Sequence, residues 1–145
     1  MPLPEPKPGL VICYSYLWRD QAAAGASEGR KDRPCAIVLL LENREGELLT
    51  YVAPVTHSRP ADLAYAVEIP PPVKRRLGLD AEQSWIIADD LNCFAWPGAD
   101  LRPITTEPVW RYDFGFLPHE LFADLKRRVL DARETGDLKI SKRDT

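Results

Sequence analysis

The chain is divided into short apolar runs, which proline, glycine and small polar residues separate. Residues 35–41 form a run without polar alternation, which is typical of a strand buried on both faces. Pro34 fixes its own backbone angle and disfavours helix at the residue before it, so Arg33 should be extended at the start of this strand. The other strands predicted from such runs are residues 9–17, 48–55, 64–69, 84–89, 92–96 and 101–104.

Helical spacing of apolar residues occurs near the end of the chain, where residues 117–133 are predicted to form the one long helix. Pro118 suits the first turn of that helix. Residues 73–77 are predicted to form a short basic helical turn that ends at Gly78. Several strands at short spacing followed by a terminal helix favour a mostly β fold, a small antiparallel barrel or curled sheet.

The sequence Asn-Arg-Glu-Gly at residues 43–46 lies between two apolar runs and predicts a β-hairpin. In an antiparallel hairpin, the start of the first strand lies beside the end of the second. Counting outward from the turn therefore brings Arg33 close to Thr56, His57 and Ser58. An arginine at the rim of a rigid strand is a common way to build a phosphate or carboxylate site, so this edge of the sheet is the candidate functional site.

With 145 residues, the chain is long enough for one domain with a sizeable core, which we place at residues 9–133. Residues 1–8 carry proline at every second position and are expected to form an extended lead-in. Residues 134–145 are charged and are expected to be a frayed tail. Residues 19–32 are small, polar and glycine-containing, which indicates a long mobile loop of the kind used as a lid or binding loop.

The composition narrows the possible function classes. A net charge of -3 does not provide the overall basic field of many nucleic-acid-binding proteins. The three cysteines and two histidines show no metal-ligand spacing, so we expect reduced thiols, no metal site and no cofactor. The chain has no apolar signal segment and no run of membrane-spanning length, so a cytoplasmic protein without membrane attachment is expected. Phosphate-loop, dinucleotide-binding and serine-hydrolase motifs are absent.

Several motifs occur in a characteristic order along the chain. A strand end rich in tyrosine and tryptophan, residues 14–18, is followed by a loop and by Gly29-x-x-x-Arg33-Pro34 before an aliphatic strand. Pro-Val-Thr-His-Ser at residues 54–58 matches a P-[IV]-T-[ST] strand end. Further matches are Ala-Asp-Asp at residues 88–90, Phe-Ala-Trp at 94–96 and Gly-Phe-Leu-Pro at 115–118. In this order, the motifs resemble the PemK/MazF family, the ribosome-independent mRNA-cleaving toxins of type II toxin–antitoxin systems.

The resemblance implies an SH3-like barrel with a C-terminal helix, a homodimer, and metal-independent cleavage of single-stranded RNA. It also implies a cognate antitoxin whose peptide lies over the RNA groove, and DNA binding together with that antitoxin. Ile87 stands where some family members carry arginine, and Asp90 stands where many carry glutamine. These departures motivate an alternative, a catalytically inactive module that binds RNA or a peptide. An unrelated small barrel acting through a dimer surface is a third hypothesis.

A metal-free ribonuclease needs a cation that stabilises the pentavalent phosphate, a base for the 2′-hydroxyl and an acid for the leaving oxygen. Arg33 is expected to supply the cation, because a guanidinium can bind two phosphate oxygens and stays charged at physiological pH. A salt bridge to a neighbouring carboxylate is the alternative for Arg33. The resemblance implies that Thr56 donates its hydroxyl to the scissile phosphate. Asp89 is a base, a ligand of Arg33, or a member of an ordinary ion pair.

The other candidates are binding or proton-transfer residues around this pair. His57 titrates near physiological pH, but neighbours in a strand point to opposite faces, so it reaches the site only if the strand has bent there. Ser58 should lie on the same face of the strand as Thr56 and is a further candidate for the site. Trp18 is expected to stack on RNA bases, with core packing as the alternative. Arg30 and Lys31 are expected to add positive charge to the RNA-binding surface.

Overall fold

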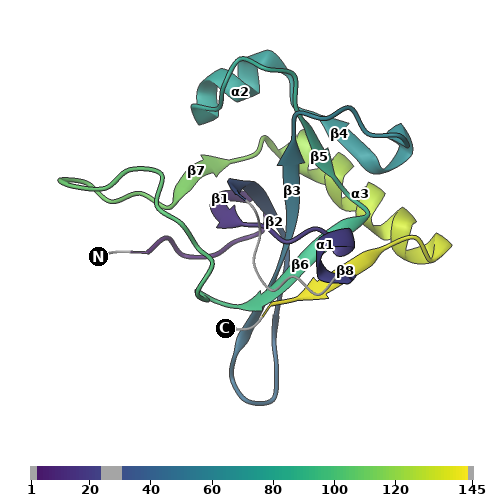
Figure 1. Cartoon of the computed structure of the whole chain (residues 1–145), viewed down its shortest axis with the longest axis horizontal. Coiled ribbons are helices and arrows are strands. Elements are labelled where there is room, and N and C mark those ends of the chain that lie inside the picture. The colour runs from purple at the N-terminus through teal and green to yellow at the C-terminus, as the bar shows by residue number, and fades with distance from the viewer. Residues whose placement is uncertain (1–2, 24–30, 144–145) are drawn as a thin grey trace.

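Strands dominate the computed structural model, which describes residues 3–23 and 31–143. They form one eight-stranded sheet in the order β4-β5-β3-β2-β1-β7, in which β6 pairs with β3 and β8 pairs with β6. Only the pair of β6 and β8 is parallel among the described strand pairs (Figure 1). The strands are β1 (Leu10–Ser15), β2 (Asp32–Glu42), β3 (Leu48–Thr56), β4 (Ala66–Glu68), β5 (Trp85–Ile87), β6 (Asp90–Ala95), β7 (Asp113–Phe116) and β8 (Lys139–Lys142).

The long helix α3 (His119–Thr135) packs its apolar stripe against the sheet, with Leu125 and Ala132 fully buried. It follows Pro118 and ends at Gly136, whose left-handed backbone (φ 81°) closes the last turn. The other helical elements are α1 (Arg19–Ala23), α2 (Pro71–Leu77) and the 3-10 turn η1 (Leu63–Tyr65). The predicted mostly β fold with a C-terminal helix is confirmed. No helix of the described residues is long and apolar enough to cross a membrane.

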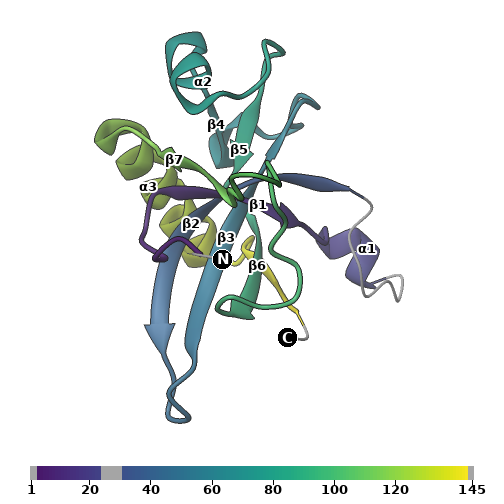
Figure 2. The same cartoon turned by 90° about the vertical axis from the view of Figure 1, so that its left-hand side faces the viewer.

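β2 and β3 form the predicted hairpin, whose turn projects from the body at the end opposite α2 (Figures 1 and 2). Asn43 closes the turn, because its side-chain oxygen accepts hydrogen bonds from the backbone N–H groups of Glu45 and Glu47. The prediction that residues 35–41 are buried on both faces is wrong beyond Val38. Leu39 and Leu41 are 43% and 47% exposed, because the hairpin extends past the core here.

Side chains of β1 divide between two apolar clusters on opposite faces of the sheet. Val11 belongs to the cluster that α3 covers. Ile12 and Tyr14 belong to the second cluster, in which the Tyr14 ring stacks on Phe94 with 4.6 Å between the ring centroids. The curled sheet is therefore packed on both faces.

The C-terminal segment is not a frayed tail, as its charge predicted. Residues of β8 pair with β6, and Arg143 is buried just beyond that strand. Its guanidinium donates to the carbonyl oxygen of Ser15 and to the side-chain oxygen of Asn92, and it forms a salt bridge with Asp100 at 3.1 Å. A polar segment can join a sheet when a buried, hydrogen-bonded arginine anchors it.

Several predicted boundaries also need correction. Residues 101–104 contribute only an isolated bridge from Leu101 to Tyr14, and the edge strand beside β1 is β7 instead. The predicted loop at residues 19–32 begins with α1 and ends in β2, while its residues 24–30 lie outside the described part of the chain. The predicted strand at residues 64–69 starts with η1, which the Asp62 side chain caps. The predicted helical turn at residues 73–77 is part of α2, which begins two residues earlier at Pro71, and its end at Gly78 is confirmed.

Candidate functional site

The register of the hairpin places Arg33 beside the end of β3. Cys35 pairs with Pro54, and one terminal nitrogen of the Arg33 guanidinium donates to the carbonyl oxygen of Val55 at 3.1 Å. The guanidinium is thus bonded to the neighbouring strand, and no carboxylate among residues 3–23 and 31–143 forms a salt bridge with it. The predicted convergence of Arg33 with the end of β3 is confirmed.

Trp18 lies against Arg33, with 5.1 Å from the guanidinium carbon to the ring centroid. The indole ring is itself held edge-on by Tyr16, at 5.1 Å between centroids. Burial lowers the pKa of the Arg33 guanidinium, yet an arginine remains cationic at neutral pH. Its Nε is buried and has no hydrogen-bond partner among the described residues.

An open groove of about 390 Å³ surrounds this pair, and we call it the Arg33 groove. A smaller inner pocket of about 160 Å³ lies beside it and shares Lys31, Arg33 and His57 with it. The Arg33 groove is lined by Trp18, Lys31, Arg33, Thr56, His57, Ser58, Arg59, Pro60 and Ile87. Most of the predicted site residues therefore line one concave surface.

Thr56 is the last residue of β3, and its hydroxyl oxygen accepts a hydrogen bond from the backbone N–H of Ser58 at 3.1 Å. This contact uses the hydroxyl as an acceptor, so its hydrogen can be donated to a bound oxygen atom. The chain turns directly after Thr56. Because the strand has ended, both Thr56 and His57 line the groove, and the alternation that would have turned His57 away no longer applies.

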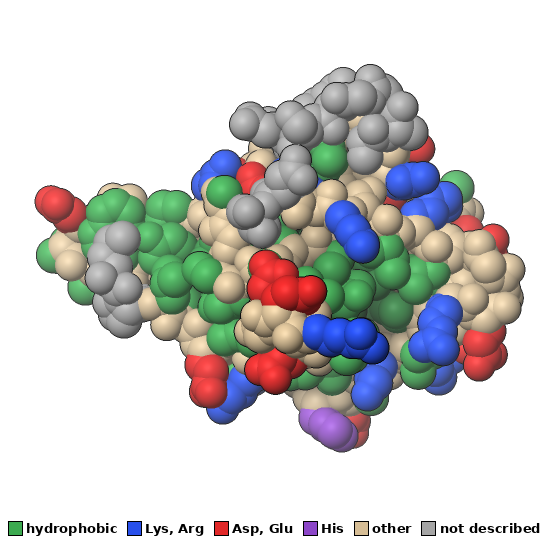
Figure 3. Space-filling view, turned by 90° about the horizontal axis from the view of Figure 1, so that it is seen from below, with side chains coloured by type: hydrophobic (Ala, Val, Ile, Leu, Met, Phe, Trp, Pro, Cys, Tyr) green, Lys and Arg blue, Asp and Glu red, His purple; other side chains and the backbone are tan. Residues whose placement is uncertain are grey.

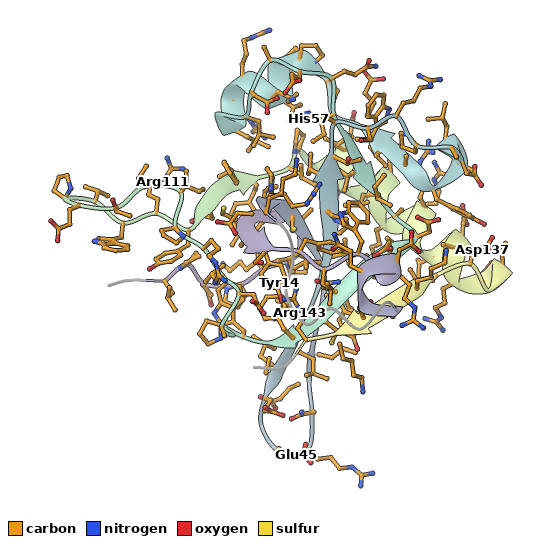
Figure 4. The ribbon with its side chains drawn as sticks, viewed as in Figure 1. Tyr14, Glu45, His57, Arg111, Asp137 and Arg143 are labelled. Atoms are coloured by element: carbon orange, nitrogen blue, oxygen red, sulfur yellow. The ribbon has the colours of Figure 1, made fainter. Side chains whose placement is uncertain are left out.

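His57 lies at the end of β3 below α2, where both ring nitrogens have partners (Figure 4). Nε2 lies 2.9 Å from a carboxylate oxygen of Asp80 and 3.4 Å from one of Glu82. Nδ1 lies 3.0 Å from the hydroxyl of Ser84 and 3.3 Å from the carbonyl oxygen of Gln83. Polar contacts thus hold the imidazole against the segment between α2 and β5.

Lys74 supports this connection from within the protein. Its ammonium group is buried and donates to Asp80 at 2.8 Å, to the Ser84 hydroxyl at 2.6 Å and to the carbonyl oxygen of Glu82. The hydrogen bond from Lys74 holds the pKa of the Asp80 carboxyl below its usual value. The roles of Lys74, Asp80 and Ser84 could not be predicted from the sequence, because their only signal there is an ordinary basic turn followed by polar residues.

Asp89 does not line the Arg33 groove. The backbone of Asp89 accepts a hydrogen bond from Lys139 of β8, burial raises the pKa of its carboxyl, and its predicted contact with Arg33 does not occur among the described contacts. Its neighbour Asp90 instead accepts a hydrogen bond from the Tyr16 hydroxyl at 2.5 Å. Arg30 lies outside the described residues.

The thiols offer no nucleophile at this site. All three cysteines are free; Cys35 and Cys93 are buried and Cys13 is half-buried. Burial raises the pKa of the Cys13 thiol to about 11, so the thiol is protonated at neutral pH.

Within the described residues, one group of side chains has ligand atoms close enough to hold a metal ion. His57, Asp80 and Glu82 place three such atoms within 4.8 Å of one another. No metal site was expected from the spacing of histidines and cysteines along the chain, whereas these three residues come together from two separate segments. The residue spacing therefore could not reveal the group.

Neither a protein-family model nor a curated protein matches this sequence. Among solved structures, a similar chain belongs to an endoribonuclease in complex with its cognate antitoxin from Mycobacterial species. The two chains are 12% identical, the match covers 90% of this chain and 96% of the other, and the TM-score is 0.54. The protein has the fold of this endoribonuclease. The resemblance to PemK/MazF toxins, stated from the sequence motifs, is thus confirmed at the level of the fold.

Proposed function

We propose that the protein is an endoribonuclease that cleaves single-stranded RNA without a metal ion in the reaction, as the toxin of a type II toxin–antitoxin system. The observation that carries the proposal is the half-buried Arg33, which lies against Trp18 and opens into a groove that also contains the Thr56 hydroxyl. This arrangement occurs on the fold of an endoribonuclease. A fixed cation beside a hydroxyl donor suits a phosphodiester whose negative charge increases in the transition state.

In the proposed reaction, the 2′-hydroxyl of the RNA loses its proton to His57 as its oxygen attacks the adjacent phosphorus, and the bond from phosphorus to the 5′-oxygen breaks as that oxygen takes a proton from water. Arg33 binds the non-bridging phosphate oxygens, and the Thr56 hydroxyl donates a hydrogen bond to one of them. Trp18 and Lys31 bind the nucleotides next to the scissile bond through stacking and charge. The protonated arginine and the hydroxyl need no metal ion for these roles.

His57 is the proposed proton-transfer group, because it lines both the Arg33 groove and the inner pocket. Its partners suit either protonation state. In the neutral ring, Nδ1–H donates to Ser84 or to Gln83 and Nε2 can take up a proton. In the protonated ring, Nε2–H donates to Asp80. The Ser84 hydroxyl can then turn to the carbonyl oxygen of Glu82. No buried donor or acceptor is lost when the proton moves.

The proposal includes a cognate antitoxin that covers the Arg33 groove, a homodimer, and DNA binding by the complex with the antitoxin. The similar solved chain is itself in complex with an antitoxin, which supports this partner. Apolar side chains exposed on β2, α3 and β8 offer a surface for a partner protein, among them Leu39, Leu130 and Ile140. On the face that carries the hairpin turn, charged side chains of both signs are interspersed with apolar ones (Figure 3).

The decisive experiment is cleavage of single-stranded RNA by the purified protein in EDTA, compared with Arg33→Ala. We expect the variant to cleave at least about 100-fold more slowly, which is the usual loss when one stabilising donor is removed from a transition state. Arg44→Ala is the matched control, because Arg44 is exposed in the hairpin turn at the other end of the molecule. Intact RNA with the wild type, or equal cleavage by Arg33→Ala, would contradict the proposal.

A second candidate function is binding of RNA or a peptide in the same groove without cleavage. Ile87 favours it, because an apolar side chain lines the groove where some family members carry arginine. An RNA gel-shift assay separates the two functions. Binding that depends on Arg33, together with intact RNA after long incubation, supports the binding module. Growth arrest on expression that Arg33→Ala relieves supports the toxin.

A further inference from the structure

His57, Asp80 and Glu82 form a mixed nitrogen and oxygen ligand set at the rim of the inner pocket. Nε2 of His57 lies 2.9 Å from Oδ2 of Asp80 and 3.4 Å from Oε2 of Glu82. In a tetrahedral zinc site with ordinary zinc–nitrogen and zinc–oxygen bonds, neighbouring ligand atoms lie about 3.3 Å apart. Small side-chain movements would therefore admit an ion between these three atoms.

The groups behind the ligands hold them in a binding orientation. The other ring nitrogen of His57 faces the Ser84 hydroxyl at 3.0 Å and the Gln83 carbonyl oxygen at 3.3 Å. Oδ1 of Asp80 accepts hydrogen bonds from the Lys74 ammonium at 2.8 Å and from the Glu82 backbone N–H at 3.1 Å, which leaves Oδ2 for an ion. Metal-binding histidines and carboxylates are usually oriented by such partners.

The two side chains that orient the ligands, Ser84 and Lys74, are buried, which restricts their movement. Ser84 is fully buried and Lys74 is 5% exposed, whereas the three ligand side chains are exposed and open to solvent. An exposed group of carboxylates alone would carry little weight. Here an imidazole provides the third ligand, and the buried side chains of Ser84 and Lys74 fix the positions of two of the three ligands.

The donor set also indicates which kind of ion fits. Magnesium and calcium prefer sites made of oxygen atoms, and an imidazole nitrogen is not their usual ligand. Imidazole together with carboxylates suits zinc and neighbouring transition metals. The Lys74 ammonium offsets part of the negative charge of the two carboxylates, so the net charge of the site is low. This favours a moderate affinity over that of a permanently loaded structural site.

We propose that His57, Asp80 and Glu82 bind a divalent transition-metal ion of the zinc type, with water completing the coordination. The ion joins the end of β3 to the connection between α2 and β5. It also occupies Nε2 of His57 and removes this ring from proton transfer, a regulatory consequence that rests on the proposed function. Zinc bound at this site then inhibits RNA cleavage, although the cleavage reaction itself uses no metal ion.

The test uses binding and not cleavage, so its result is independent of the proposed ribonuclease function. The full chain is treated with EDTA, exchanged into chelator-free buffer and titrated with zinc chloride by calorimetry and by thermal unfolding. We expect one ion per chain and an unfolding temperature that rises with zinc concentration. His57→Asn abolishes both effects, and Ser84→Ala weakens binding about 10-fold. Magnesium chloride at the same concentrations produces neither effect.

The chain offers a matched control, because its only other histidine, His119, is exposed at the start of α3. His119→Asn keeps the zinc response, and cobalt bound to the wild type shows a visible absorption band that His57→Asn lacks. An equal zinc response in His57→Asn, or no response of the wild type up to high micromolar zinc, would overturn the proposal. An ion pair between protonated His57 and the two carboxylates would then account for their contacts.

Discussion

The guanidinium of Arg33 lies against the ring of Trp18, and the two side chains come from β2 and from the segment between β1 and α1. The ring limits the positions open to the guanidinium, and the hydrogen bond to Val55 fixes one of its nitrogens. Arg33 is therefore oriented before any ligand binds. An oriented cation loses less conformational entropy on binding a phosphate than a free surface arginine does.

The first prediction concerns Trp18 and follows from this contact. Trp18→Ala removes both the support of Arg33 and a stacking surface, and stacking of one base contributes about 1–3 kcal/mol to binding. We expect RNA affinity to fall by a corresponding amount, with a smaller loss for Trp18→Phe, which retains a ring. Fluorescence anisotropy with a short single-stranded RNA measures the loss. Equal affinities for wild type and Trp18→Ala would show that the ring has no part in RNA binding.

The second prediction distinguishes the chemical role of the Thr56 hydroxyl from the role of the shape of the side chain. Thr56→Val keeps the branched side chain but cannot donate a hydrogen bond, so single-turnover cleavage should slow by about 100-fold, as for loss of one transition-state donor. Thr56→Ser keeps the hydroxyl and should keep most of the rate. Since the hydroxyl accepts a hydrogen bond from Ser58, chemical denaturation must show that both variants are folded. Similar rates for the two variants would exclude a chemical role for the hydroxyl.

Local sequence signals predicted the part of the site that the hairpin builds. Pro34 marked the start of β2, the turn at residues 43–46 set the pairing, and the count outward from it placed Arg33 beside Thr56. Each of these steps depends on residues close in sequence or on a regular register. The same reasoning identified α3, whose apolar residues recur at helical spacing.

The remaining features depend on contacts between distant segments. Lys74 holds Asp80, and Asp80 reaches His57 only because the segment between α2 and β5 lies beside the end of β3. Polar residues in a turn carry no signal of such a contact. β8 pairs with β6 through backbone hydrogen bonds, and the only apolar side chain within its bounds, Ile140, is 40% exposed. Asp89 was assigned to the site from a motif, but its segment turns toward β8. Neither the hydrophobic pattern of the sequence nor its short motifs could predict where these residues lie.

The third prediction tests whether the C-terminal segment stabilises the domain. Arg143 is 7% exposed and pairs with Asp100 at 3.1 Å, so Arg143→Met leaves that carboxylate only its longer contact with Arg102, at 3.8 Å. Breaking a buried pair in this way typically costs about 3–5 kcal/mol of unfolding free energy. Lys142→Met is the matched control, because Lys142 precedes Arg143 in the chain and is exposed. Urea unfolding of the three proteins measures the difference. Equal stability of both variants would mean that the buried arginine does not anchor β8.

The fourth prediction concerns Asp90, whose pKa is raised by burial despite the hydrogen bond from Tyr16. A carboxyl whose pKa is higher in the folded than in the unfolded state binds more protons when folded over the pH range between the two values. The free energy of unfolding therefore decreases as the pH rises from about 3.9, the usual aspartate value, through the folded pKa. Asp90→Asn does not titrate, and its amide oxygen can still accept the hydrogen bond from Tyr16.

The stability of Asp90→Asn relative to the wild type should therefore increase across this pH range and stay higher at neutral pH. Urea unfolding at a series of pH values measures the difference between the two proteins. Glu107→Gln is the control, because Glu107 is exposed and its removal should leave the pH dependence of stability unchanged. A difference between Asp90→Asn and the wild type that decreases as the pH rises would show that Asp90 is better stabilised as a carboxylate. The Tyr16 hydroxyl and the Arg19 backbone N–H would then outweigh the cost of burial.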